Sequence, residues 1–336
     1  MNLSTKIVNG VKFLKTYINK GSYCNYPPLI LMVEPTNVCN IQCGMCPNGI
    51  MTREKGYMSF NLYKRLIDNN NDFIQSLNLY VMGEPLLNLQ LTAMVKYAKN
   101  KNIRTNIFTN GTLLTKDLSR KLIIAGTDEI SVSFECVSCL SEYNGKGADH
   151  EDVFNNIKML VRERNILKKY LPLLSVRFLN YGFTRKEFHD WRKRLRRAGV
   201  DYIWKVPMHD WTGMYSPVVK QNKKLKKKYF HCVLPWGVLA VLWNGQVVGC
   251  CDDFDGKFLV GDINETPKLS DIWNNDKMLH LRKVLATRQY QKVDICKNCA
   301  RLWLSPFKYP IFENALWELI VGYHNAWNKL RSKFFT

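Results

Sequence analysis

The chain has 336 residues, of which 46% are hydrophobic and 23% are charged, and Lys and Arg exceed Asp and Glu by 49 to 28, a net charge of +21. This composition excludes a chain that is disordered throughout, and the length predicts roughly two domains. The first residues lack the apolar core of a secretory signal, so we expect a cytoplasmic protein. Disulfides are rare there, so the 11 cysteines must serve metal binding, catalysis or core packing.

An amphipathic helix is predicted within residues 1–28, with Ser4 as its N-cap. Four apolar residues recur there at helical spacing, namely Ile7, Val11, Leu14 and Ile18. Apolar stripes of this kind usually face the core of the protein, so we expect these four side chains to be buried.

Short β-rich runs alternate with longer amphipathic stretches across residues 29–219, which predicts repeated βα units around a parallel sheet. Six such units favour an α/β fold with a partial (β/α)6 TIM-like barrel over a complete eight-stranded barrel. The predicted strands are residues 29–34, 77–82, 103–109, 129–135, 173–180 and 200–206. Chemistry in such folds gathers at the carboxyl ends of the strands.

A basic connector at residues 220–228 marks the start of a predicted second domain, a small α+β unit over residues 220–305. Asn244-Gly245 lies between apolar runs and predicts a β-hairpin, and a helix is predicted over residues 269–287. Residues 306–336 carry a broad apolar stripe that predicts a C-terminal amphipathic helix. A core-facing role is the ordinary interpretation of the terminal helices, and peripheral membrane contact is the alternative.

Three cysteines, Cys39, Cys43 and Cys46, follow the first predicted strand, with three and then two residues between them. A four-iron cluster normally takes four thiolates, so three thiolates leave one iron open to a small molecule. A zinc knuckle or three unrelated core cysteines are the alternatives. Zinc usually requires a fourth protein ligand nearby in the sequence, and none follows here.

This spacing, with the bulky Met45 before the third cysteine, resembles the signature of the radical S-adenosylmethionine (radical SAM) superfamily. The resemblance implies a [4Fe–4S] cluster whose open iron binds S-adenosylmethionine, which is reductively cleaved to a 5′-deoxyadenosyl radical that abstracts hydrogen from the substrate. It also implies cofactor contacts at later strand ends. These are the backbone of Gly83, Glu84 and Pro85 for the amino group, Asn110, Ser133 and Glu135 near the ribose, and Arg177 for the carboxylate.

Five further cysteines lie in the C-terminal region: Cys232, Cys250, Cys251, Cys296 and Cys299. Four thiolates can close one site, and on chemistry alone zinc and an iron–sulfur cluster both fit. The flanking sequence resembles the SPASM/twitch auxiliary domain that follows radical SAM barrels. This resemblance implies a second [4Fe–4S] cluster on Cys232, Cys250, Cys296 and Cys299, with Cys251 as the alternative to its neighbour. We expect Cys24 to be a buried core residue.

The predicted reaction is oxidation of a small polar substrate, such as a sugar or an aminocyclitol, with the auxiliary cluster as electron acceptor and His209 or Asp210 as base. About 28 residues precede the first strand and the cysteines suffice for one auxiliary cluster, which favours a small molecule over a peptide. The auxiliary region resembles that of aminocyclitol dehydrogenases in this superfamily. Hydrogen return by Cys136 or Cys251 would instead give an epimerase. The sequence is also compatible with peptide maturation, with a lipid-linked substrate, and with a non-catalytic metal-binding or nucleic-acid-binding protein.

The positive charge is concentrated in residues 185–197 and 220–228. Nucleic-acid binding would require aromatic residues interleaved with these cations or a known binding motif, and neither is evident. We therefore expect docking of an acidic flavodoxin or ferredoxin that delivers the electron, with an anionic membrane surface or a solvated basic face as alternatives.

Overall fold

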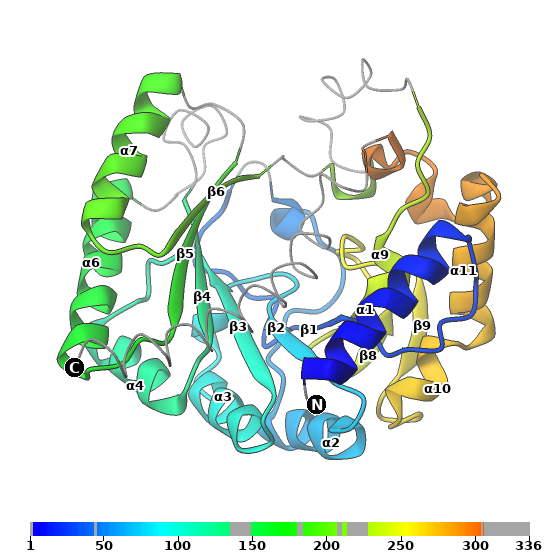
Figure 1. Ribbon diagram of the computed structural model, residues 1–336, viewed down its shortest axis with the longest axis horizontal. Coiled ribbons are helices and arrows are strands. Elements are labelled where there is room, and N and C mark those ends of the chain that lie inside the picture. Colours follow the sequence, from blue (N-terminus) through cyan, green and yellow to red (C-terminus); the bar gives the residue numbers. More distant parts are fainter. Residues whose placement is uncertain are drawn as a thin grey trace.

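The computed structural model describes residues 3–43, 46–134, 149–179, 184–206, 210–213, 228–303 and 305. Within these ranges nine strands form one sheet, in the order β6-β5-β4-β3-β2-β1-β7-β8-β9 (Figure 1). The first six pair in parallel. They are β1 (Ile30–Val33), β2 (Ser76–Leu79), β3 (Arg104–Thr109), β4 (Glu129–Ser133), β5 (Leu173–Leu179) and β6 (Tyr202–Val206). The predicted α/β partial barrel is therefore confirmed.

Helices cover the outer face of this parallel sheet (Figure 1). They are α2 (Phe60–Asn70), α3 (Leu91–Asn100), α4 (Lys116–Ala125), α6 (His150–Ile166) and α7 (Arg185–Arg197). Polar side chains start several of them: the Ser59 hydroxyl accepts the Leu62 N–H, and Thr184 forms a capping box with Glu187. Gly126 ends α4 in the left-handed conformation, with φ of 88°.

The inner face of the sheet carries polar side chains. Residues paired in register on neighbouring parallel strands point to the same face, so the paired Ser131 and Ser175 lie side by side there. Ser131 on β4 and Ser175 on β5 lie 2.6 Å apart, hydroxyl to hydroxyl. Both hydroxyl oxygens also lie within hydrogen-bonding distance of the Glu129 carboxylate, at 3.1 and 2.9 Å respectively. A buried hydrogen-bond network therefore joins two strands of the barrel on its inner side.

The C-terminal region continues the same sheet. After the short helix α9 (Leu234–Gly237), strand β7 (Val238–Val241) pairs in parallel with β1. The predicted hairpin is confirmed, since β7 pairs antiparallel with β8 (Gln246–Val248) across Asn244-Gly245, and β9 (Leu259–Asp262) follows. The boundary proposed near residue 220 falls outside the described residues and stays a prediction.

The single helix predicted over residues 269–287 is two helices, α10 (Leu269–Trp273) and α11 (Asp276–Ala286). The break has a local cause, because the Asn275 side chain accepts the Met278 N–H and starts α11 as its N-cap. Short helical turns also occur around the strand ends and the closing cysteines. They are η1 (Pro47–Gly49), η2 (Pro85–Leu87), η3 (Trp211–Gly213), η4 (Tyr290–Lys292), η5 (Asp294–Cys296) and η6 (Ala300–Trp303).

The N-terminal helix α1 (Leu3–Ile18) forms as predicted but faces the other way, and Ser4 lies inside it rather than at its cap. Phe13 and Tyr17 are buried, whereas the predicted core-facing residues Ile7, Val11, Leu14 and Ile18 are exposed. The two aromatic rings lie on the opposite side of the helix, where Tyr17 donates to the His231 carbonyl and packs against Trp236, and these contacts anchor its orientation. The predicted C-terminal helix lies outside the described residues. None of the described helices is long and apolar enough to cross a bilayer.

Candidate active site

The three-cysteine loop follows β1 and rests on the turn that ends β2. The Cys46 N–H donates to the Cys43 carbonyl at 2.9 Å, and the Glu84 N–H donates to the Val38 carbonyl at 2.8 Å. Gly83 has φ of +75°, and a Cβ placed on it would lie 2.6 Å from the carbonyl oxygens of Thr36 and Val38. Only glycine allows the two backbones to approach this closely, so Gly83 sets the position of the loop.

Glu84 joins the ends of β2 and β3 through a buried carboxylate. One carboxylate oxygen accepts from the Thr109 hydroxyl at 2.7 Å and the Leu86 N–H at 3.0 Å, and the other accepts from the Asn110 N–H at 2.7 Å. Burial raises the pKa of Glu84 to about 7, against the opposite effect of these three donors. The Glu84 side chain therefore holds these two strand ends together.

Asn110 connects that turn to the first cysteine. Its amide nitrogen donates to the Asn40 side-chain oxygen at 2.9 Å and lies 4.0 Å from the Cys39 sulfur. Burial raises the pKa of the Cys39 thiol, whereas hydrogen bonds from the Ile41 and Asn40 backbone and from Asn110 lower it. Donors directed at a sulfur stabilise its thiolate, which is the form that binds iron. The surroundings of Cys39 therefore fit a cluster ligand.

An aromatic and cationic layer lies on the inner face above the serine network. The rings of Tyr80 and Phe108 have centroids 3.9 Å apart, and the Arg177 guanidinium lies 4.5 Å from the Phe108 centroid. Arg177 pairs in register with Ser133. The Arg177 Nε is buried and has no hydrogen-bond acceptor among the residues that the structure describes. A buried guanidinium nitrogen without an acceptor fits an anionic group of a ligand.

The five C-terminal cysteines come together, although they are spread over 68 positions of the sequence, from Cys232 to Cys299. Burial is the main cause that raises the pKa of all five thiols. The charge of Cys232 adds to this rise at each of the other four, which places it electrostatically among them. These sulfurs are buried or partly buried, and their thiolates would repel one another unless they shared a positively charged group, so this donor set fits an iron–sulfur cluster.

A buried ion pair lies beside these cysteines. Arg301 and Asp252 are both buried, and the Arg301 Nη2 donates to the Asp252 carboxylate at 3.0 Å. The Arg301 charge lowers the pKa of Cys232, Cys251 and Cys299, in opposition to their burial. Burial raises the pKa of Tyr80, and the charges of Arg177, Cys251, Asp252 and Arg301 also influence it. Tyr80, on the inner face of the barrel, therefore lies within electrostatic range of Cys251 and the buried ion pair.

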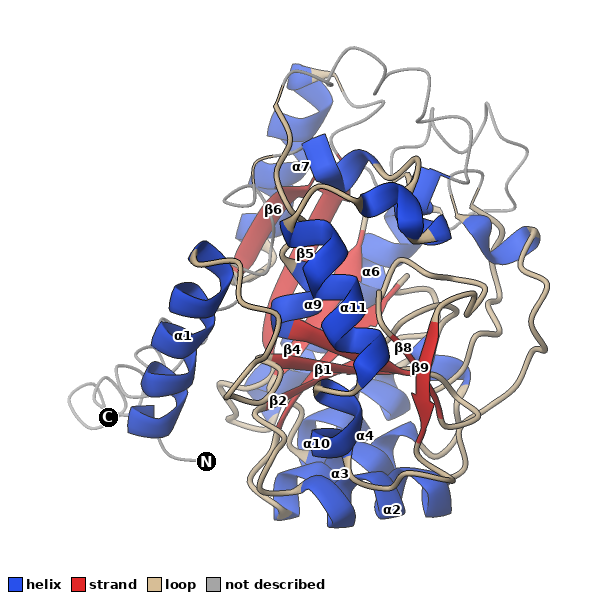
Figure 2. Ribbon diagram, turned by 90° about the vertical axis from the view of Figure 1, so that its right-hand side faces the viewer, coloured by secondary structure: helices blue, strands red, loops and turns tan. Residues whose placement is uncertain are grey.

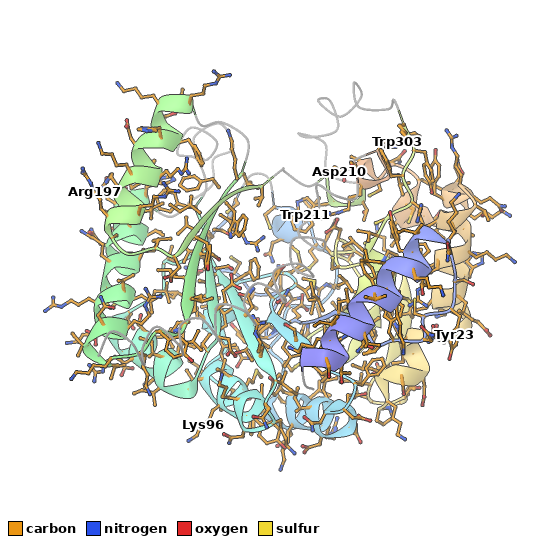
Figure 3. The ribbon with its side chains drawn as sticks, viewed as in Figure 1. Tyr23, Lys96, Arg197, Asp210, Trp211 and Trp303 are labelled. Atoms are coloured by element: carbon orange, nitrogen blue, oxygen red, sulfur yellow. The ribbon has the colours of Figure 1, made fainter. Side chains whose placement is uncertain are left out.

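Asp210, a predicted base, is buried where the residues after β6 meet the auxiliary region. Figure 3 places it near Trp303. Its carboxylate accepts the Ala300 N–H at 2.6 Å, and burial raises its pKa. The other predicted base, His209, lies outside the described residues, as do Met45, Glu135 and Cys136. Cys24 is buried in the core as predicted.

Arg53 was not predicted as part of this region, yet it connects the end of the first strand with the segment that follows Cys250 and Cys251. Its guanidinium binds both oxygens of the buried Glu34 carboxylate, at 2.5 and 2.7 Å, and its Nε donates to the Phe254 carbonyl at 2.6 Å. Glu34 ends the first strand and Phe254 follows Cys250 and Cys251. The contact links positions 201 residues apart, so no local pattern could have indicated it.

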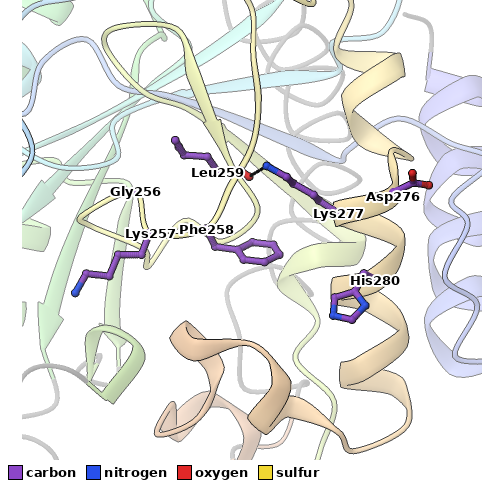
Figure 4. Close-up of a pocket in the computed structure, with 7 residues that line it drawn as sticks. All are labelled: Gly256, Lys257, Phe258, Leu259, Asp276, Lys277 and His280. Atoms are coloured by element: carbon purple, nitrogen blue, oxygen red, sulfur yellow. Dashed lines mark hydrogen bonds between the residues drawn. The ribbon is translucent and has the colours of Figure 1, made fainter.

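Across the described residues, no three Cys, His, Asp or Glu side chains converge closely enough to hold a single metal ion. Thiolates of one four-iron cluster bind separate irons, so a cluster does not require such convergence. A separate pocket lies between Gly256–Leu259 and α11 (Figure 4). The Lys277 ammonium there donates to the Leu259 carbonyl at 2.9 Å, and the pocket includes none of the predicted site residues.

Comparison with known proteins defines the class. Residues 33–202, about half of the chain, match the radical SAM superfamily, and residues 232–300 match SPASM, an iron–sulfur cluster-binding domain. The chain therefore belongs to the radical SAM superfamily and is a radical SAM enzyme with a C-terminal SPASM domain. Its cofactors are a [4Fe–4S] cluster and S-adenosylmethionine, together with auxiliary iron–sulfur binding in the SPASM domain.

Among individual relatives, the S-adenosyl-L-methionine-dependent 2-deoxy-scyllo-inosamine dehydrogenase of Niallia circulans is 26% identical, over 80% of this chain and 92% of its own. The Fe-coproporphyrin III synthase of Methanosarcina barkeri is 32% identical, over 82% and 81% of the two chains. The crystal structure of BtrN in complex with AdoMet and 2-DOIA is 24% identical, covers 81% of this chain and 92% of that one, and has a TM-score of 0.57. At this identity the similarity to the crystal structure shows a shared fold and nothing more.

Proposed function

We propose that this enzyme dehydrogenates a small polar substrate of the sugar or aminocyclitol class. The similarity to the Niallia circulans dehydrogenase supports this proposal, since it extends over 80% of this chain and 92% of that enzyme. The observation that carries it is the polar inner face of the barrel, where Tyr80 lies within electrostatic range of both Arg177 and the auxiliary cysteine Cys251. Such a position suits a substrate that must lie close to both cysteine groups.

In this proposal Cys39, Cys43 and Cys46 hold the cluster that binds S-adenosylmethionine. One auxiliary [4Fe–4S] cluster takes Cys232, Cys250, Cys296 and Cys299. When bound, these groups supply a hydrogen-abstracting 5′-deoxyadenosyl radical and an acceptor for the second electron.

The chain's own residues position and shield the reactants. Gly83 and Glu84 present backbone groups at the β2 turn, and Asn110 directs its amide toward Cys39. We assign Arg177 to a carboxylate of the cofactor and Ser133, its register partner, to the ribose. Asp210 is the candidate base among the described residues, because burial raises its pKa and so makes its carboxylate a stronger proton acceptor.

Anaerobic reconstitution tests the cofactor assignment. We expect about eight irons per chain, from two four-iron clusters, and reductive formation of 5′-deoxyadenosine. Replacing Cys39, Cys43 and Cys46 with Ala should abolish this cleavage, whereas replacing Cys296 and Cys299 should spare it and stop substrate turnover. Cys24→Ala, at a buried cysteine outside both groups, is the matched control and should retain both activities.

The product identifies the reaction. A sugar or aminocyclitol product two mass units lighter than its substrate supports dehydrogenation. A product that keeps all its hydrogens but gains one mass unit in D2O, through solvent deuterium whose incorporation is lost in Cys251→Ala, would indicate epimerisation and refute it. Turnover of a peptide or of a lipid-linked sugar, without turnover of free sugars, would contradict the small-molecule assignment.

We further propose that an acidic flavodoxin or ferredoxin docks on α7. This helix exposes six cations, namely Arg185, Lys186, Arg192, Lys193, Arg196 and Arg197, and lies at the edge of the molecule (Figure 3). Opposite charges accelerate association, and salt screens them. The rate of reduction by flavodoxin should therefore fall steeply with ionic strength, and a rate independent of salt would contradict this docking.

A further inference from the structure

The side of α1 that faces away from the protein is apolar. Ile7, Val8, Val11, Leu14 and Ile18 lie there with 40% to 68% of their surface exposed. Their spacing places them on one side of the helix, opposite the buried Phe13 and Tyr17. We call these five residues the outer stripe. A helix that is apolar on two sides needs a second surface to cover the exposed one.

Anchoring contacts prevent α1 from turning its outer stripe inward. The Tyr17 hydroxyl donates to the His231 carbonyl at 2.7 Å, and the Trp236 indole N–H donates to the Gly21 carbonyl at 2.7 Å. The Tyr17 ring also lies against those of Phe13 and Trp236. Figures 1 and 2 both show α1 on the outside of the molecule, away from the sheet. The stripe is therefore held outward by the same residues that attach the helix.

The charge around the outer stripe indicates what covers it. Residues 1–33 contain four lysines and no aspartate or glutamate, in a chain whose net charge is +21. Lys12 and Lys15 flank the stripe along the helix, and Lys20 follows its end. A second copy of the chain would bring like charges together, whereas an anionic surface complements them. An apolar stripe flanked by lysines is typical of helices that lie in the membrane interface.

We propose that the outer stripe of α1 docks this enzyme on the surface of an anionic phospholipid membrane. The apolar side chains enter the boundary between headgroups and acyl chains, and the flanking lysines lie at the level of the phosphates. Because Tyr17 bonds to His231, the residue before Cys232, docking brings the auxiliary cysteines toward the membrane side of the molecule. This proposal is independent of the reaction proposed above.

Vesicle co-sedimentation of the full-length, reconstituted protein tests it. We expect binding to vesicles of phosphatidylcholine with phosphatidylglycerol, weaker binding to phosphatidylcholine alone, and release by salt. Val11→Asp/Ile18→Asp should weaken vesicle binding about 100-fold, because two apolar side chains no longer enter the membrane interface. Ile124→Asp is the matched control, because Ile124 on α4 has the same exposed fraction as Ile18, 68%. It should bind as the wild type does.

A charge variant provides an independent measurement. Lys12→Gln/Lys15→Gln leaves the apolar residues in place and should weaken binding roughly 30-fold, from about fivefold for each lysine. Melting temperature and iron content verify that each variant is folded. Wild-type protein that does not bind anionic vesicles would overturn the proposal, and so would equal binding by wild type, the stripe variant and the lysine variant. A wild-type dimer that Val11→Asp/Ile18→Asp dissociates, without vesicle binding, would overturn it in favour of a second copy.

Discussion

Removing the Arg53 guanidinium tests how the segment after the three cysteines is joined to the auxiliary region. Glu34 is fully buried and Arg53 is nearly so, and two hydrogen bonds of 2.5 and 2.7 Å connect them. Arg53→Met leaves the Glu34 carboxylate buried without its cation. The loss of one partner of a buried pair costs about 3–5 kcal/mol. At about 2 °C per kcal/mol, a value suited to a large chain, the melting temperature should fall by roughly 6–10 °C.

Two comparisons show whether burial is the cause. Glu34→Gln/Arg53→Met removes both charges and should recover part of the loss, because no unpaired charge remains. The Arg194–Glu151 pair has the same two-bond geometry, at 2.6 Å twice, but is exposed. Glu151→Gln should therefore cost less than about 1 kcal/mol. Anaerobic thermal melts of the reconstituted proteins measure all three, and equal melting temperatures for Arg53→Met and Glu151→Gln would refute the reasoning.

Three further predictions concern the site. Gly83→Ala puts a Cβ at a positive φ and 2.6 Å from two carbonyl oxygens, so it should lower the free energy of unfolding by at least about 1–2 kcal/mol and weaken S-adenosylmethionine binding. Gly10→Ala is the control: it lies in open space inside α1 and should raise the melting temperature. Burial raises the pKa of Glu84 from 4.5 to about 7, so its protonation stabilises the fold at low pH and this contribution is lost as the pH rises through about 7. The wild type should therefore lose more melting temperature than Glu84→Gln does between about pH 5 and pH 8, and parallel curves would contradict the pKa. Arg177→Met removes a cation whose buried Nε has no acceptor among the described residues, so it should weaken cofactor or substrate binding without lowering the melting temperature. An unchanged KM for both would argue against its role.

Much of the fold followed from local patterns. The six parallel strands, the Asn244-Gly245 hairpin and the three-cysteine loop at the end of β1 were all predicted, because side-chain periodicity and turn chemistry act between near neighbours. Strand ends differed by a few residues, and the helix over 269–287 proved to be two because Asn275 starts a new one.

The orientation of α1 could not be predicted in this way. Its sequence carries two apolar sides, and periodicity alone gives no reason to bury one of them. The structure buries Phe13 and Tyr17, since Tyr17 finds its hydrogen-bond partner His231 more than 200 residues away. The outer stripe, the basis of the proposed membrane contact, is a consequence of that choice.

The sequence by itself determined the class of enzyme and its candidate ligands, because a radical SAM cluster loop is a contiguous motif whose spacing is read directly. Tertiary structure decided how the parts meet. It placed β7 beside β1, Arg53 between Glu34 and Phe254, and Arg301 beside Asp252. These contacts join residues far apart in the chain, and they depend on which surfaces pack and which buried charges find partners. Such conditions are met only when the whole chain has folded.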